Sequence, residues 1–282
     1  MEYPKEFEKL IKTTKENLIG WGNPNARILI IGKESAIPKD NDLRGKEQYE
    51  REIIKNHEFW ERNKKQGISQ DDVVPIQFCD GNDIIKNIEV YNPLYPYKGQ
   101  LNRVRRVIHN KKGEEKIAGE KGTSKTWHNY QYLSDLIFRR ERTSSNEIID
   151  FHRFFFTSEL SVITAKYSNQ VDKKAREKSI NVRKAFFADD YFKQFSIIVL
   201  AAGNYPERFG VNYETFWGPV SEVEIVDNPF EGEGIYKIVG TRGEQCKLFI
   251  QTYQLSMVSN ALIEEIAGRI IEFKNNHSIT FI

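Results

Sequence analysis

The stretch Ala26-Arg-Ile-Leu-Ile-Ile-Gly-Lys-Glu-Ser35 decides the fold class of this chain. Its centre, residues 28–31, is an unbroken apolar run rich in isoleucine, which is typical of a strand buried on both faces of a parallel sheet. Gly32 ends the run, and Glu34 follows two residues later. Because ligands of open α/β sheets bind beyond the carboxyl ends of the strands, this carboxylate is well placed for chemistry. A plain strand-to-loop turn with a solvated Glu34 is the alternative that this stretch leaves open.

Composition limits the classes of function that need consideration. The 282 residues suffice for one large domain, and 42 basic against 40 acidic residues leave a net charge of only +2. Overall charge therefore predicts no partner, and any contact with nucleic acid must come from a local patch. With only Cys79 and Cys246, and no His-x-x-x-His pair, we expect no disulfide framework, iron–sulfur cluster, metal site or other cofactor. The sequence shows no signal peptide and no apolar run of membrane-spanning length, which predicts a soluble, cytoplasmic protein.

Strand-like and helix-like patterns alternate along the chain, which predicts a layered α/β domain with a mostly parallel sheet. Residues 1–282 are interpreted as one domain with an insertion at about 45–125. Buried strands are expected at 28–31, 151–156, 196–202 and 247–252, a β pair at 222–226 and 235–239, and helices at 5–18, 126–142, 170–195 and 259–274. Within the insertion we expect a charged helix at 45–64, a short strand at 73–78, a helix at 100–109 and a surface loop at 111–125.

Polar residues follow four of the expected strands, and in a parallel sheet these ends share one edge. They are Lys33, Glu34 and Ser35; Ser158 and Glu159; Asn204; and Gln254 and Ser256. Of two neighbouring carboxylates one can serve as a base, and amide side chains read the donor and acceptor edge of a heterocycle. Tyr253 and the tyrosines of the 91–97 loop could stack on such a ring. The structural alternatives are a salt bridge for Glu159, a turn for Asn204, a surface position for Gln254 and core packing for the tyrosines.

A local basic surface is expected between residues 166 and 184. Its lysines and arginines, Lys173, Lys174 and Arg176 among them, outnumber the acidic residues there and suit phosphate groups. A second basic group is formed by Arg103, Arg105 and Arg106. The alternative for both is an ordinary solvated helix face.

Taken together, these segments resemble the uracil-DNA glycosylase-like superfamily. Gly32-Lys-Glu-Ser35 after the first strand is similar to the first motif of that family. Phe249-Ile-Gln-Thr-Tyr-Gln-Leu-Ser256, before the last helix, is similar to its closing strand and His-Pro-Ser loop, with Gln254 in the position of the histidine. Phe155-Phe-Thr-Ser-Glu-Leu160 is similar to the strand whose end holds the residue that reads the base. The resemblance covers most of the chain outside 45–125.

The resemblance implies a three-layer αβα fold with a short central parallel sheet and a pocket for a base flipped out of the duplex. On that model Glu34 would orient or deprotonate the attacking water, and Gln254 would donate a hydrogen bond to the departing base. The base would be held by Gly32, Lys33, Ser158, Glu159, Asn204 and Tyr253, and phosphate by Ser35, Ser256, Lys173, Lys174 and Arg176. The expected partner is DNA or another nucleic acid.

Departures from the family motifs define the alternatives. Lys33 stands where the family has Gln or Glu, Gln254 replaces the histidine, and Glu159 instead of Asn favours a base edge rich in donors. The leading hypothesis is a DNA-repair glycosidase that hydrolyses the N-glycosidic bond of a damaged or modified base. The alternatives are a catalytically inactive nucleic-acid-binding module of the same fold, and a hydrolase of free nucleosides or nucleotides.

Overall fold

A computed structural model gives the structure of the protein. It describes residues 2–37, 43–73, 91–96, 106–109, 113, 115–118, 125–140, 149–165, 167–220, 222–227, 235–241, 246–256 and 258–281. Within these residues no helix is both long and apolar enough to cross a membrane.

One mixed sheet forms the centre of the described chain, with the strand order β1-β5-β2-β6-β9-β8-β7. Its four middle strands, β5, β2, β6 and β9, run parallel, and the outer strands join antiparallel. This confirms the predicted α/β fold with a parallel core. The strands are β1 Trp21–Gly22, β2 Ile28–Gly32, β5 Phe155–Glu159, β6 Ile197–Ala201, β7 Val223–Asp227, β8 Ile235–Thr241 and β9 Lys247–Thr252.

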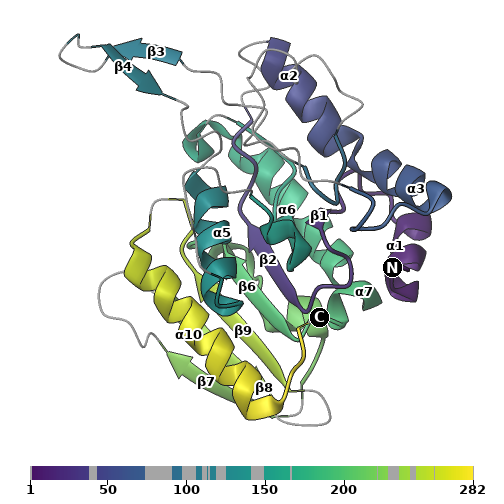
Figure 1. Cartoon of the computed structure of the whole chain (residues 1–282), viewed down its shortest axis with the longest axis vertical. Helices are drawn as coiled ribbons and strands as arrows, with labels where there is room; N and C mark the ends of the chain where they lie inside the picture. The colour runs from purple at the N-terminus through teal and green to yellow at the C-terminus, as the bar shows by residue number, and fades with distance from the viewer. Residues whose placement is uncertain are drawn as a thin grey trace.

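Helices cover both faces of the sheet because side chains of each strand alternate between two cores. Leu29 and Ile31 of β2 pack into one core with α1, α3, α6, α7, α8 and α9, whereas Ile28 and Ile30 pack into the other with α5 and α10. Figure 1 shows α5 and α10 on one side of the strands and α6, α7 and α1 on the other. The helices are α1 Lys5–Thr13, α2 Leu43–Tyr49, α3 Asn56–Gln66, α5 Lys125–Ile137, α6 Lys173–Phe187, α7 Asp190–Lys193, α8 Tyr205–Phe209, α9 Tyr213–Trp217 and α10 Asn260–His277.

The parallel strands end level with one another and form what we call the carboxyl edge. Gly32 lies opposite Glu159 in the neighbouring strand, and Ala201 lies opposite Thr252. The chain runs from β2 outward to β5 and then crosses to β6 on the other side of β2. The point where the strand order reverses therefore lies between the ends of β2 and β6, which is where open α/β sheets bind ligands.

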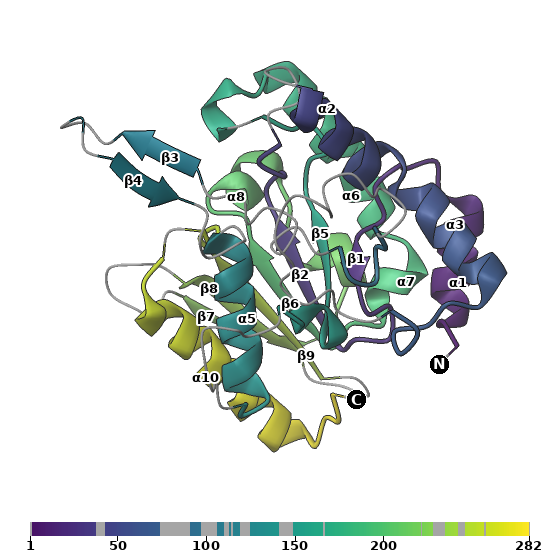
Figure 2. The same ribbon diagram turned by 45° about the horizontal axis from the view of Figure 1, so that its top comes forward.

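Two predictions within the expected insertion are wrong. Residues 106–109, predicted as the end of a helix, form strand β3 (Arg106–His109), and the predicted surface loop contains strand β4 (Glu115–Ala118). The two segments form strands because they pair with each other in an antiparallel ribbon, in which the β-branched Val107 lies opposite Ile117. The ribbon stands apart from the three layers in Figures 1 and 2. The predicted strand at 73–78 lies, beyond Val73, outside the described residues, as do Arg103 and Arg105.

Other element boundaries differ from the sequence expectation. The first helix ends at Thr13 rather than at 18, and the predicted helix at 45–64 is divided into α2, a π-helix (Glu50–Ile54) and α3. The strand predicted at 151–156 begins only at Phe155, after a 3₁₀ turn. Trp60 of α3 packs in the same core as α1. The described helical part of the expected insertion is thus continuous with the body of the fold.

Candidate functional site

Glu34 lies two residues beyond β2, at the point where the strand order reverses, and its side chain is buried. The residue is 5% exposed. Its Oε1 accepts a hydrogen bond of 3.1 Å from the hydroxyl of Tyr205 and lies 3.8 Å from a guanidinium nitrogen of Arg176. Its Oε2 is buried and has no hydrogen-bond partner among the described residues. One oxygen of the carboxylate is thus held by the protein, whereas the other is a buried polar atom without a described partner.

Arg176 and Tyr205 reach Glu34 from two helices that cover the same face of the sheet. Arg176 lies in the first turn of α6, which begins with Asp172 as its N-cap, and it also donates to the carbonyl of Ser168. Its guanidinium carbon lies 5.1 Å from the centre of the Tyr205 ring. Burial, and then the charge of Glu34, raise the pKa of Tyr205, so that this phenol remains a donor to the carboxylate.

Lys33 brings a second cation to the same ring. Its Nζ lies 5.0 Å from the centre of Tyr205, and its side chain passes over Gly203 at the end of β6, where an added Cβ would meet Nζ at 3.1 Å. Burial lowers the pKa of Lys33; Glu34 opposes this shift, and the positive charge of Arg176 adds to it. No hydrogen bond or ion pair joins the Lys33 ammonium to the part of the chain that the structure describes.

Glu159 at the end of β5 supplies the second carboxylate of the carboxyl edge. Its side chain lies over Gly32, where an added Cβ would approach its Oε2 to 2.2 Å, so any larger residue at this position would displace the carboxylate. The hydroxyl of Ser35 lies 3.5 Å from its other oxygen. Burial, followed by the charge of Glu159, raises the pKa of Tyr130 on α5. The two acidic residues predicted at this edge therefore come from adjacent strands, as expected.

Arg183 anchors the end of β5 from the inner face of α6. It is fully buried and donates to the hydroxyl of Ser158, to the carbonyl of Leu18 and to the carbonyl of Glu159. Burial lowers its pKa to about 10 against the opposing charge of Glu16, so the guanidinium is positive at neutral pH. The hydroxyl of Ser158 also donates to Ile19. Ser158 thus donates one hydrogen bond and accepts another within the protein.

The loop after β9 carries the remaining predicted residues of the sheet edge. Tyr253, Gln254 and Ser256 are each partly exposed, and the loop turns through a hydrogen bond from the amide of Ser256 to the carbonyl of Gln254. The side-chain amide of Asn129, which is buried on α5, donates a hydrogen bond to the backbone carbonyl of Leu255 in this loop. The loop joins the carboxyl edge through its strand, since the amide of Gly203 donates to the last carbonyl of β9.

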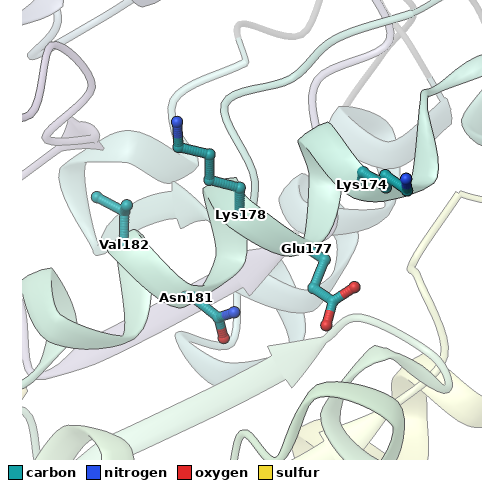
Figure 3. A pocket seen from close by; sticks show the side chains of 5 residues that line it. All are labelled: Lys174, Glu177, Lys178, Asn181 and Val182. Carbon is teal, nitrogen blue, oxygen red and sulfur yellow. The ribbon is translucent and has the colours of Figure 1, made fainter.

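Three predicted residues are exposed at the surface. Asn204 is exposed at the start of α8, and Lys173 and Lys174 are exposed on α6, whose inner face carries Arg176. A shallow hollow of about 510 Å³ lies over the outer face of α6; Figure 3 shows its lining side chains, Lys174, Glu177, Lys178, Asn181 and Val182. All five come from one exposed helix face, so this hollow is separate from the cluster around Glu34.

Tyr91 and Tyr95 were candidates for base stacking, and the structure contradicts that role. Both are almost fully buried, and the hydroxyl of Tyr91 accepts a hydrogen bond from the indole of Trp21. Tyr253 keeps partial exposure. Across the described ranges, no group of three or more His, Cys, Asp or Glu side chains has the arrangement needed to hold a metal ion.

Two residues that shape the site were not predicted in that role: Tyr205 was not selected, and Arg183 was counted only with the expected basic surface at 166–184. Tyr205 follows directly on the Gly-Asn pair at the end of β6, so its position at a strand end was a usable signal. Arg176 and Arg183 are seven residues apart and therefore share one helix face, which predicts that they point the same way. That this face is the buried one depends on the packing of α6 against the sheet.

Comparison of the sequence with models of known protein families gives no match. A search among characterised proteins likewise finds no relative.

Proposed function

We propose that this protein hydrolyses the N-glycosidic bond of a modified base in DNA, with Glu34 as the carboxylate that orients and deprotonates the attacking water. The proposal is carried by Oε2 of Glu34, which is buried and has no hydrogen-bond partner among the described residues. The other oxygen, Oε1, accepts a hydrogen bond from the hydroxyl of Tyr205. A carboxylate fixed through one oxygen presents the other in a defined direction, as general base catalysis requires.

The charges around Glu34 suit this role. An isolated buried carboxylate would be costly, and the cations Arg176 and Lys33 compensate its charge. In the proposed reaction, water adds to the anomeric carbon as the bond to the base breaks, and the proton of the water passes to Glu34. Gln254 would donate a hydrogen bond to the departing base, and the half-buried Tyr253 would stack on it.

The architecture also supports the proposal. Three layers around a short parallel core are what the glycosylase resemblance implies, and the residues of the similar motifs lie at or next to the ends of β5, β2 and β9, three of the four parallel strands. Position at the reversal of strand order adds an argument independent of the resemblance, because nucleotide ligands of such sheets bind there.

Glu159 would set the choice of base. An ionised carboxylate accepts hydrogen bonds and donates none, so it pairs with amino and imino groups rather than with a carbonyl. Its position over Gly32 brings it to the same edge as Glu34. We therefore favour a base with amino or protonated ring nitrogens over uracil.

The second candidate is a nucleic-acid-binding module without chemistry, and one observation favours it. Arg176 already pairs with Glu34, so this carboxylate has a charged partner within the protein before any ligand binds. In that case the cluster would serve only to hold the ends of the strands and α6 together.

A panel of duplex oligonucleotides separates the two candidates. Each duplex carries one lesion, such as uracil, hypoxanthine or an N-alkylated purine, and released base is detected by mass spectrometry. Glu34→Gln removes the proposed base with little change in shape, and Glu58→Gln is a matched control at an exposed position on α3. We expect release of at least one base by the wild type and Glu58→Gln, and none by Glu34→Gln.

The contrary result is equally clear. Salt-dependent binding of DNA that survives Glu34→Gln, with no base released from any duplex, would establish the binding module instead. Release from free nucleosides but from no oligonucleotide would move the substrate class to small molecules.

A further inference from the structure

The amine of Lys33 is placed as a nucleophile beside a carboxylate. It extends from the residue next to Glu34 across the end of β6 and lies over Gly203 and the ring of Tyr205. The absence of a side chain at Gly203 leaves room for this path, because a Cβ there would stand only 3.1 Å from Nζ. Other lysines at the described surface, such as Lys65 at the end of α3, are exposed instead.

Two features make this amine more reactive than an ordinary lysine. It is partly desolvated, and a second cation, Arg176, lies against the same aromatic ring. Both effects disfavour the ammonium form and lower its pKa, while Glu34 acts against them. A desolvated lysine next to another cation is a recurring arrangement in enzymes that form Schiff bases with carbonyl substrates.

We infer that Lys33 forms an imine with the aldehyde of an abasic deoxyribose, which would give the protein a strand-cleaving lyase activity in addition to base removal. The inference deepens the proposed function, because an abasic site is the product of that reaction. Its geometric basis is the position of Nζ at the carboxyl edge, next to Gly203 and over the ring of Tyr205, whose hydroxyl donates to Glu34.

The chemistry is balanced without any co-reactant except water. The lone pair of Nζ adds to the C1′ aldehyde of the ring-opened sugar, and loss of one water leaves the imine. Glu34 then removes a proton from C2′; the C–H electron pair forms the C2′–C3′ double bond as the C3′–O bond breaks and the 3′-phosphate leaves. Water hydrolyses the imine, which releases the unsaturated aldehyde and restores the amine. No atom is oxidised or reduced overall.

Borohydride trapping tests the inference directly. The protein is incubated with a duplex that carries a preformed abasic site, and sodium borohydride reduces any imine to a stable amine. The adduct is seen as a shifted band and located by peptide mass spectrometry. We expect an adduct on Lys33 in the wild type and in Lys65→Arg, and its loss in Lys33→Arg, which keeps the positive charge. The trapping rate should rise with pH and level off below the pKa of an ordinary lysine.

Mapping the wild-type adduct keeps the test independent of how well the variant folds. An adduct on the N-terminal amine or on another lysine would overturn the inference, and so would the absence of any adduct. Because the duplex already carries an abasic site, formation of the adduct does not depend on whether the protein can remove a base. Trapping on Lys33 without base release from any lesion would refute the proposed function alone, and base release without trapping would refute the lyase alone.

Discussion

The coupling between Arg176 and Glu34 is the energetic prediction that follows most directly from the site. Their charged groups are 3.8 Å apart, with side chains only 8% and 2% exposed. At an effective dielectric constant of about 20, two unit charges at about 4 Å attract by about 4 kcal/mol. Lys33 remains near Glu34 after the change, so we expect Arg176→Met to lower the free energy of unfolding by about 3 kcal/mol, the lower end of the range for a broken buried pair.

A double-mutant cycle isolates this interaction from other effects of the substitution. Arg176 also donates to the carbonyl of Ser168, and that bond is lost whether or not Glu34 is present. Arg176→Met, Glu34→Gln and the double variant are therefore unfolded in urea, and the three free-energy changes are compared. We expect the double variant to be more stable than the sum of the single changes predicts, by about 2 kcal/mol.

Arg153 provides the matched control. Its guanidinium forms an ion pair of 3.5 Å with Asp71, but both side chains are well exposed, and such pairs contribute at most about 1 kcal/mol. Arg153→Met should therefore be nearly neutral. A coupling energy below about 0.5 kcal/mol between Arg176 and Glu34, or equal losses for the two arginines, would refute the claim that a buried ion pair fixes the Glu34 carboxylate.

Three further predictions concern the sheet, a buried lysine and the loop after β9. Gly32→Ala should displace the Glu159 carboxylate and abolish base release, with little loss of stability. Gly22→Ala should instead unfold in markedly less urea, because Gly22 has a φ of +98° and an added Cβ would lie 2.2 Å from a backbone oxygen. Burial lowers the pKa of Lys247 to about 8, so above that pH the unfolded state binds more protons than the folded state. The stability of the wild type relative to Lys247→Met, measured in thermal melts, should therefore rise from pH 8 to pH 10. Asn129→Ala removes the side-chain donor to the loop after β9, so amide exchange in that loop should accelerate while β9 stays protected.

Three of the four strands of the parallel core were predictable because their sequences are continuous apolar runs. Ile28 to Ile31, Ile197 to Leu200 and Leu248 to Ile250 are buried on both faces, which is the environment that favours such runs. The N-cap of the last helix, Ser259, was also readable, since its side chain accepts from the amide of Leu262.

Elements that depend on distant partners were not predictable in this way. Strand β1 is two residues long and exists because Trp21 pairs with Thr157, far along the chain. Likewise Val107 becomes extended because Ile117 returns alongside it. The local sequence does not show which distant strand a segment will pair with. Residues 151–153 illustrate the same point: their aromatic pattern suggested a strand, but they form a 3₁₀ turn.

The same division applies to the site. Placing Glu34 and Glu159 at one edge required only the rule that parallel strands end together. Assigning Arg176 to phosphate was natural for a residue in a basic run, yet its helix turns it inward to Glu34 while Lys173 and Lys174 remain outside. Which face of α6 is buried is a property of the assembled layers.

On the proposed mechanism the Glu34 carboxylate performs the base-removing step. Single-turnover release of a lesion base from duplex DNA, measured in parallel for the wild type, Glu34→Gln and Glu58→Gln, is the decisive experiment. General base catalysis contributes on the order of 10²–10⁴ in rate, so we expect a fall of that size for Glu34→Gln and none for Glu58→Gln. Equal rates for the wild type and Glu34→Gln would rule out this role for Glu34.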